Sequence, residues 1–203
     1  MTIDIRIPAL TCGKALARWM LGLFAASATL GAVAAPSYPV APQPDQAAGT
    51  AYSYLWIIGS TFHPVETATT YSYPGGGCIS KTGGSSPLFT HKAVLPEGAV
   101  VRYIRLYFYD NSTSSIWAAV TTYDGLGNYS YNGSTIYSTD DFPGSYASIL
   151  SPLLSYPVNQ YASAISVTAN LGEQNDSNLR FCGVRIAYDE PISDRIFANG
   201  FDL

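Results

Sequence analysis

Residues 95–112 read Leu-Pro-Glu-Gly-Ala-Val-Val-Arg-Tyr-Ile-Arg-Leu-Tyr-Phe-Tyr-Asp-Asn-Ser, and this stretch decides the fold class. A Pro-Glu-Gly turn precedes a long run of β-branched and aromatic residues, and Asp-Asn-Ser ends it. Side chains of a strand alternate between its two faces, so one face carries only Ile104, Leu106 and Phe108. The other face carries aromatic rings and a charge, on Tyr103, Arg105, Tyr107 and Tyr109. The stretch therefore predicts a central strand that packs on a core on one side.

Turns separate this stretch from other segments with strand character. We expect strands over residues 52–58, 67–73, 78–81, 88–94, 116–123, 129–139, 162–169 and 179–188. In the last of these, Cys182, Val184, Ile186 and Tyr188 share a face, which should form core beside Ile104, Leu106 and Phe108. Residues 145–154 are ambiguous, because their apolar side chains have helical spacing but the segment is short and close to two prolines. The pattern predicts one all-β domain over residues 51–190, a single antiparallel β-sandwich of jelly-roll-like form.

The first 34 residues have the pattern of an export signal. Arg6, Lys14 and Arg18 form a basic region, an apolar stretch begins at Trp19, and a small-x-small site ends at Ala34. The apolar stretch is short for a membrane span, although an uncleaved anchor is the alternative. We therefore expect a secreted protein, extracellular or at the cell surface, with the periplasm as a further possibility and no membrane span after cleavage.

Charge is scarce in this chain. Charged residues make up 12% of it, against roughly a quarter in typical domains. Cleavage after residue 34 removes three cations and the anion Asp4 from a chain of net charge −4, which leaves −6. Binding to nucleic acid needs clustered Lys and Arg, so an acidic chain argues against a nucleic-acid partner.

Two cysteines remain after the signal, because Cys12 is lost with it. In an exported chain, Cys78 and Cys182 are expected to form one disulfide. Two buried free thiols are the alternative. A metal site is disfavoured because the chain has only two histidines and no Cys-x-x-Cys pair. We expect no cofactor.

The two ends of the chain lie outside the predicted sandwich. Residues 35–50 contain four prolines and are expected to form an extended linker. Residues 191–203 form a C-terminal tail. Its residues 196–202, Ile-Phe-Ala-Asn-Gly-Phe-Asp, resemble the Ile-Phe-x-x-Gly-Phe-Glu/Asp ending of many exported gammaproteobacterial proteins, although this chain ends in Asp-Leu. That resemblance implies a sorting or surface-handling signal, and the alternative is a peptide that docks on the sandwich.

Several short motifs resemble those of a group of uncharacterised secreted bacterial β proteins. They are Phe-His-Pro at 62–64, Gly-Gly-Cys-Ile at 76–79, Leu-Pro-Glu-Gly-Ala at 95–99, Tyr-Asp-Gly at 123–125 and Phe-Cys-Gly-Val-Arg-Ile-Ala-Tyr at 181–188. The resemblance covers about residues 54–188. It implies the same sandwich and the same cysteine pair, and it implies no activity.

Catalytic signatures are weak. His63 and His91 lack a nucleophile motif such as Gly-x-Ser-x-Gly, so structural roles are favoured for both. Glu66 and Glu97 are the residues that a glycosidase pair would use, but both lie near turns where solvated carboxylates are common. We expect no enzyme. Loop oxygens offer weak calcium candidates, which turn chemistry also explains: Asp124, Asn128, Asp140 and Asp141.

Aromatic residues offer the candidate binding surface. Tyr103, Tyr107 and Tyr109, together with Trp117, are candidates for a platform on which sugar rings stack. The alternative is that this face is buried or forms a subunit interface, where tyrosine is also favoured. Two functions follow: a secreted non-catalytic protein with a structural or surface-interaction role that self-associates, or a carbohydrate-binding module. Burial of the tyrosines would remove the support for the second.

Overall fold

The computed structural model describes residues 51–138, 144–175 and 177–191. The predicted signal, the predicted linker and residues 192–203 of the tail lie outside them. The described part contains no α-helix, and no helix in it is long and apolar enough to cross a membrane. Its one helical element is a 3₁₀ turn, η1 (Gly59–Thr61).

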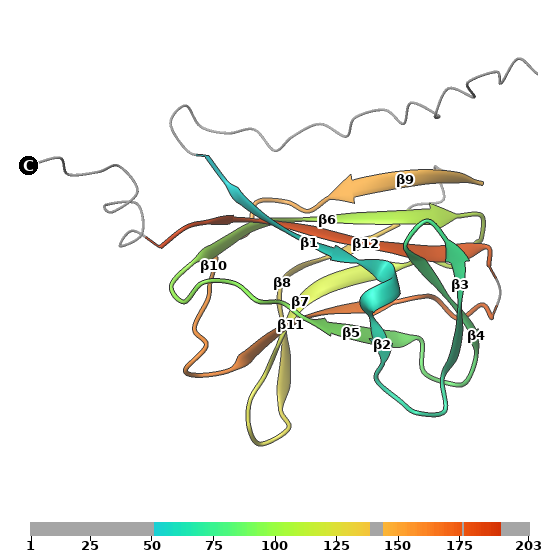
Figure 1. Cartoon of the computed structure of the whole chain (residues 1–203), viewed down its shortest axis with the longest axis horizontal. Helices are drawn as coiled ribbons and strands as arrows, with labels where there is room; N and C mark the ends of the chain where they lie inside the picture. Colours follow the sequence, from blue (N-terminus) through green and yellow to red (C-terminus); the bar gives the residue numbers. More distant parts are fainter. Residues whose placement is uncertain (1–50, 139–143, 176, 192–203) are drawn as a thin grey trace, which may run out of the picture. The chain divides into compact units, whose positions relative to one another are not determined.

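Two antiparallel sheets form the predicted jelly-roll-like β-sandwich. Sheet A contains β1 (Ser53–Ile58), β3 (Thr70–Gly75), β4 (Cys78–Gly83), β6 (Val100–Asp110), β9 (Ser145–Leu150), β10 (Tyr156–Pro157) and β12 (Leu179–Asp189). Sheet B contains β2 (His63–Pro64), β5 (Leu88–Lys92), β7 (Trp117–Tyr123), β8 (Tyr129–Tyr137) and β11 (Ala164–Asn170). In Figure 1, β1, β6, β9 and β12 form the upper layer, and β5, β7 and β11 lie beneath them. The predicted fold class is confirmed.

Strands β6 and β12 form the centre of sheet A. They pair along almost their whole lengths, with Ile104 opposite Ile186 and Leu106 opposite Val184. Strand β12 also pairs with β1 and β4, and β6 with β9 and β10. The predicted inner side chains of β6 are at most 1% exposed, and they pack with those of β12 in the core. Burying each of these large apolar side chains contributes about 1.5–3 kcal/mol.

A β-bulge in β12 corrects the predicted face of that strand. The register shifts between Phe181 and Gly183, so Phe181 and Val184 are both buried while Cys182, between them, is half-buried. Gly183 has φ +128°, and a Cβ there would lie 2.2 Å from the carbonyl oxygen of Ile57. Only glycine tolerates that conformation and that approach. The predicted grouping of Cys182 with Val184 and Ile186 was therefore wrong.

The bulge brings Cys182 to its disulfide partner. Cys78 at the start of β4 is bonded to Cys182, with their Cα atoms 3.9 Å apart. The bond joins strands that neighbour each other in sheet A across 104 residues of sequence. The predicted pairing is confirmed, and the alternative of two free thiols is excluded.

The ambiguous segment at 145–154 is a strand in its first part and not a helix. Residues of β9 pair with β6 from Arg105–Leu150 to Asp110–Ser145. The available edge of β6 overrides the helical spacing of the apolar residues, because pairing satisfies the backbone groups of both strands.

Removing the disulfide should lower stability without changing the fold. Closing a loop of about 100 residues restricts the unfolded chain, so a Cys78→Ser/Cys182→Ser double variant should lose on the order of 4–5 kcal/mol of unfolding free energy. Denaturant unfolding of the mature protein measures this loss, and reductant should reproduce it in the wild type. An unchanged unfolding midpoint would show that the bond contributes nothing to stability.

Candidate functional site

The outer face of sheet A carries several aromatic side chains, which together we name the aromatic face. Its backbone positions come from β1, β6 and β9 and surround β12. The alternation that buries Ile104, Leu106 and Phe108 turns their neighbours in β6 outward. The aromatic face consists of Tyr54, Trp56, Tyr103, Tyr107, Tyr109 and Tyr146.

Trp56 is the most exposed member of this face. Its side chain is 58% exposed, and its ring stacks on that of Tyr107, with the centroids 5.0 Å apart and the planes inclined by 26°. The two rings come from β1 and β6, on either side of β12. Gly183 is the β12 residue opposite Tyr107, and Arg185 is the one opposite Trp56, so the stack runs diagonally across β12 where Gly183 has no side chain. The stack therefore joins β1 and β6 across β12 on the outer side of the sheet.

Arginine side chains of β12 lie against these rings. The guanidinium of Arg185 lies 4.9 Å from the ring centre of Tyr54 and 5.2 Å from that of Trp56. Each such contact contributes about 0.5–1 kcal/mol at an exposed site. Trp56 therefore contacts two supports, the ring of Tyr107 and the guanidinium of Arg185.

A second contact of the same kind lies farther along the face. Arg180 lies 4.5 Å from the ring centre of Tyr109 and donates a hydrogen bond of 3.0 Å to the hydroxyl of Tyr146. The rings of Tyr109 and Tyr146 are 5.2 Å apart. Through Tyr146, strand β9 thereby extends the aromatic face beyond β6, the strand in which the sequence predicted three of its tyrosines.

The structure brings together three of the four predicted binding residues. Tyr103, Tyr107 and Tyr109 are half-buried on one face, so they are neither lost to the core nor fully exposed. Burial raises the pKa of the Tyr107 hydroxyl, and the charges of Arg185 and Arg105 partly offset this rise. All three rings contact other aromatic rings, those of Tyr52, Trp56 and Tyr146 respectively.

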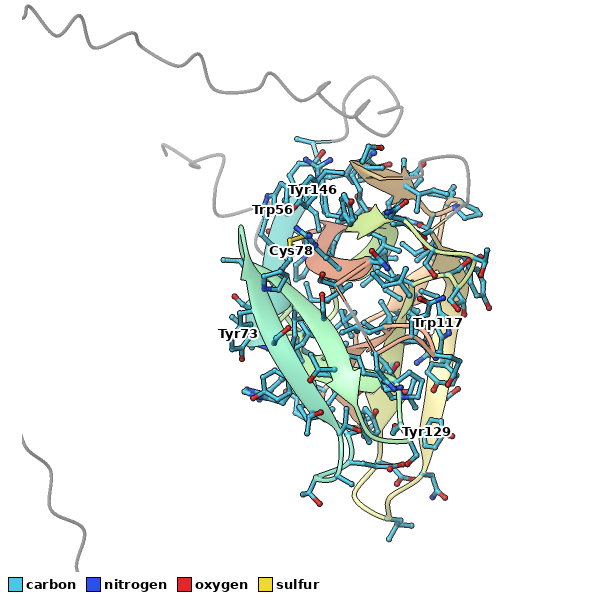
Figure 2. All side chains as sticks on the ribbon, turned by 90° about the vertical axis from the view of Figure 1, so that its right-hand side faces the viewer. Trp56, Tyr73, Cys78, Trp117, Tyr129 and Tyr146 are labelled. Atoms are coloured by element: carbon cyan, nitrogen blue, oxygen red, sulfur yellow. A yellow bond between two sulfur atoms is a disulfide. The ribbon has the colours of Figure 1, made fainter. Side chains whose placement is uncertain are left out.

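Trp117 does not join them, because it lies on the outer face of sheet B. There it forms a second group with Tyr131, Tyr129 and Tyr123, in which successive ring centres lie 5.6–6.1 Å apart. In Figure 2, Trp56 and Tyr146 lie together near the top, while Trp117 and Tyr129 lie lower on the right-hand side. The single platform predicted from these four residues is therefore two separate surfaces.

Sequence reasoning missed Tyr54, Trp56 and Tyr146. The signal for the first two was present, because Tyr54, Trp56 and Ile58 alternate in a segment already predicted as a strand. Tyr146 was hidden in the segment whose secondary structure was ambiguous. Trp56 and Tyr107 are 51 positions apart, and only the sheet pairing reveals their contact.

Hydrogen bonds within a turn explain the calcium candidates Asp124 and Asn128, the two that lie among the described residues. One carboxylate oxygen of Asp124 accepts hydrogen bonds of 2.8 Å from the backbone N–H groups of Leu126 and Asn128, and the other accepts one from the Asn128 amide. These bonds lower the pKa of Asp124. They close the turn between β7 and β8. Asp140 and Asp141 lie outside the described residues, and no group of three or more possible metal-ligating side chains occurs within them.

The two histidines weighed as catalytic groups lie on the paired strands β2 and β5, whereas Glu97 lies in the loop before β6 and Glu66 in the loop after β2. His91 Nδ1 lies 2.9 Å from the carbonyl oxygen of Thr61, and its ring contacts Phe62. His63 is exposed in the short strand β2. Glu97 accepts a hydrogen bond from the backbone of Gln160, which fixes a loop. The contacts of His91 and Glu97 are those of structural side chains.

Comparison with known proteins gives distant likenesses. No protein-family model and no curated protein matches the chain. Among solved structures, a mutant of a family 29 carbohydrate-binding module complexed with cellulohexaose has a TM-score of 0.37 and 11% identity, covering 68% of this chain and 88% of that one. A family 29 carbohydrate-binding module has a TM-score of 0.38 and 12% identity, covering 70% and 87%. A mutant complexed with mannohexaose has 0.37 and 13%, covering 70% and 90%. TM-scores this low establish neither a shared ligand nor a shared family.

The turn held by Asp124 should weaken in acid. Because the pKa of Asp124 is lower in the folded chain than its ordinary value of 3.8, its stabilising effect is complete above that value and is lost as the pH falls through the folded value. An NMR titration of the Asp124 carboxyl group should give a pKa below 3.8, with faster exchange of the Leu126 amide in the same range. At neutral pH, a calcium-induced shift of the Asp124 and Asn128 resonances would contradict this interpretation and restore the metal site.

Proposed function

We propose that this protein is a secreted, non-catalytic carbohydrate-binding protein that holds a polysaccharide on the aromatic face of sheet A. The observation that carries the proposal is the exposed Trp56 ring, stacked on Tyr107 and supported by Arg185. The disulfide supports export, because disulfides persist in oxidising compartments.

A sugar ring matches such a surface chemically. The C–H groups on the faces of a pyranose ring are apolar, and their burial against a flat aromatic ring is favourable. The edges of the sugar carry hydroxyl groups, which need hydrogen-bond partners when they leave water. Arg185, the tyrosine hydroxyls and Ser148 of β9 provide donors and acceptors beside the rings.

The supports of Trp56 also matter for affinity. A side chain that must be ordered on binding lowers the affinity, by about 0.5–1.5 kcal/mol. Trp56 already contacts Tyr107 and Arg185 in the free protein, so part of this cost is met before binding. An extended surface that carries several rings favours a long chain of sugars over a single one.

Self-association is the second candidate, and the same face favours it. Trp56 and Ile58 are both more than half exposed on β1, and aromatic and apolar side chains are enriched at the centres of protein interfaces. A second copy of the chain and a glycan would compete for this surface, so the two functions make opposite predictions about the free protein.

Replacing Trp56 with Ala should weaken binding to polysaccharide by about tenfold or more, equivalent to about 1.4 kcal/mol, because the exposed stacking surface is lost. Affinity electrophoresis of the mature protein against glucan, mannan, galactan and polygalacturonate measures this. The matched control is Tyr129→Ala, which removes a 61% exposed ring from sheet B and should leave binding unchanged.

Three outcomes would count against the proposal. Binding to none of the polysaccharides would refute it, and so would equal losses in the two variants. Light scattering that shows a dimer in the wild type and a monomer for Trp56→Ala would favour self-association instead.

A further inference from the structure

Two arginines face each other on the aromatic face. Arg105 of β6 and Arg185 of β12 are directly paired in the antiparallel register, and both lie on the outer side of sheet A. Like charges directly opposite each other in a sheet are destabilising. The pairing is therefore a feature that packing alone does not favour.

Neighbouring side chains hold the two charges in place. Arg185 lies against the rings of Tyr54 and Trp56, as described above. Arg105 is 3% exposed, and its Nη1 donates a hydrogen bond of 3.3 Å to the hydroxyl of Ser148. Burial lowers the pKa of Arg105, the nearby Tyr107 partly offsets this and the charge of Arg185 lowers the pKa further, yet a guanidinium stays protonated in proteins. The charge of Arg185 is thus half-buried on the outer side of the sheet, and the charge of Arg105 lies beside it and is almost fully buried.

Within the four strands that form the aromatic face, acidic side chains do not neutralise the charges of Arg105 and Arg185. Strands β1, β6, β9 and β12 contain two acids, Asp110 and Asp189. Asp110 is buried and accepts a hydrogen bond from Ser138, and Asp189 forms an ion pair of 2.7 Å with Arg102. Arg180 adds a third cation, against Tyr109. An acidic chain has therefore gathered positive charge on the surface that carries its exposed tryptophan.

We propose that the polysaccharide held on the aromatic face is acidic and carries carboxylate groups, as in a uronate polymer, and that Arg185 binds a carboxylate while its sugar ring lies on Trp56. The inference rests on the proposed function. The planar guanidinium forms two parallel hydrogen bonds with a carboxylate, which a neutral sugar hydroxyl cannot match. A carboxylate at Arg185 also interacts favourably with the charge of Arg105 and offsets the repulsion between the two arginines.

The test compares polygalacturonate with the same polymer after chemical reduction of its carboxyl groups. Wild-type mature protein should bind the acidic polymer about tenfold or more tightly than the reduced one, because hydrogen bonds to a charged group are stronger than those to a neutral one. This preference should shrink as the salt concentration rises.

Two variants test whether Arg185 causes the preference for the acidic polymer. Arg185→Gln should lose the preference for the acidic polymer and retain the weaker binding to the reduced one. The matched control is Lys92→Gln, which removes one positive charge from the exposed end of β5 on sheet B and should keep the full preference. Thermal unfolding of each variant checks the fold, and the comparison of the two polymers on the wild type needs no variant.

The outcomes separate the two proposals. Equal affinity of the wild type for both polymers would overturn the acidic ligand and leave carbohydrate binding intact. Two results would indicate a general attraction of anions instead of a carboxylate site, and would overturn the inference. They are loss of the preference in Lys92→Gln, and binding of dextran sulfate as tight as that of polygalacturonate. Binding to neither polymer, nor to any neutral polysaccharide, would refute the proposed function itself.

Discussion

The antiparallel pairing of β6 with β12 is the interaction on which the rest of the structure depends. Both strands are eleven residues long, and each has further strands of sheet A on its other edge. Their inner side chains form the middle of the core, where Phe181 meets Phe62 edge to face. Because strand side chains alternate, the same pairing that buries the aliphatic residues places tyrosine and arginine outside. The inner face of this strand pair therefore forms the core, and its outer face forms the candidate binding surface.

The bulge at Gly183 connects this pairing to the remaining features of sheet A. It keeps both Phe181 and Val184 in the core and turns Cys182 toward Cys78. It also places a residue without a side chain opposite Tyr107, where the ring of Trp56 stacks. A regular strand would alternate through this point and would bury either Phe181 or Val184, but not both. One irregularity therefore serves the core, the disulfide and the aromatic face.

The sequence was sufficient for the fold class, because the alternation in residues 103–109 is strong and turn residues separate the strands. It was sufficient for the disulfide, since only two cysteines follow the predicted signal. It was not sufficient for the site. A one-residue register shift moves Cys182 out of its expected face, and nothing local in the sequence marks it apart from the glycine. Trp117 and Tyr107 have equivalent local patterns, so their assignment to different sheets depends on long-range pairing. The opposed pair Arg105 and Arg185 is likewise visible only in the register.

The most direct measurement of the central claim uses the tryptophans as reporters. The chain has three, and Trp19 lies in the predicted signal, so the mature protein should show two indole N–H signals by NMR, from Trp56 on sheet A and Trp117 on sheet B. Titration with oligogalacturonate should shift the Trp56 signal progressively and leave the Trp117 signal in place. A shift of the Trp117 signal alone, or of neither, would contradict the claim that the aromatic face of sheet A is the binding surface.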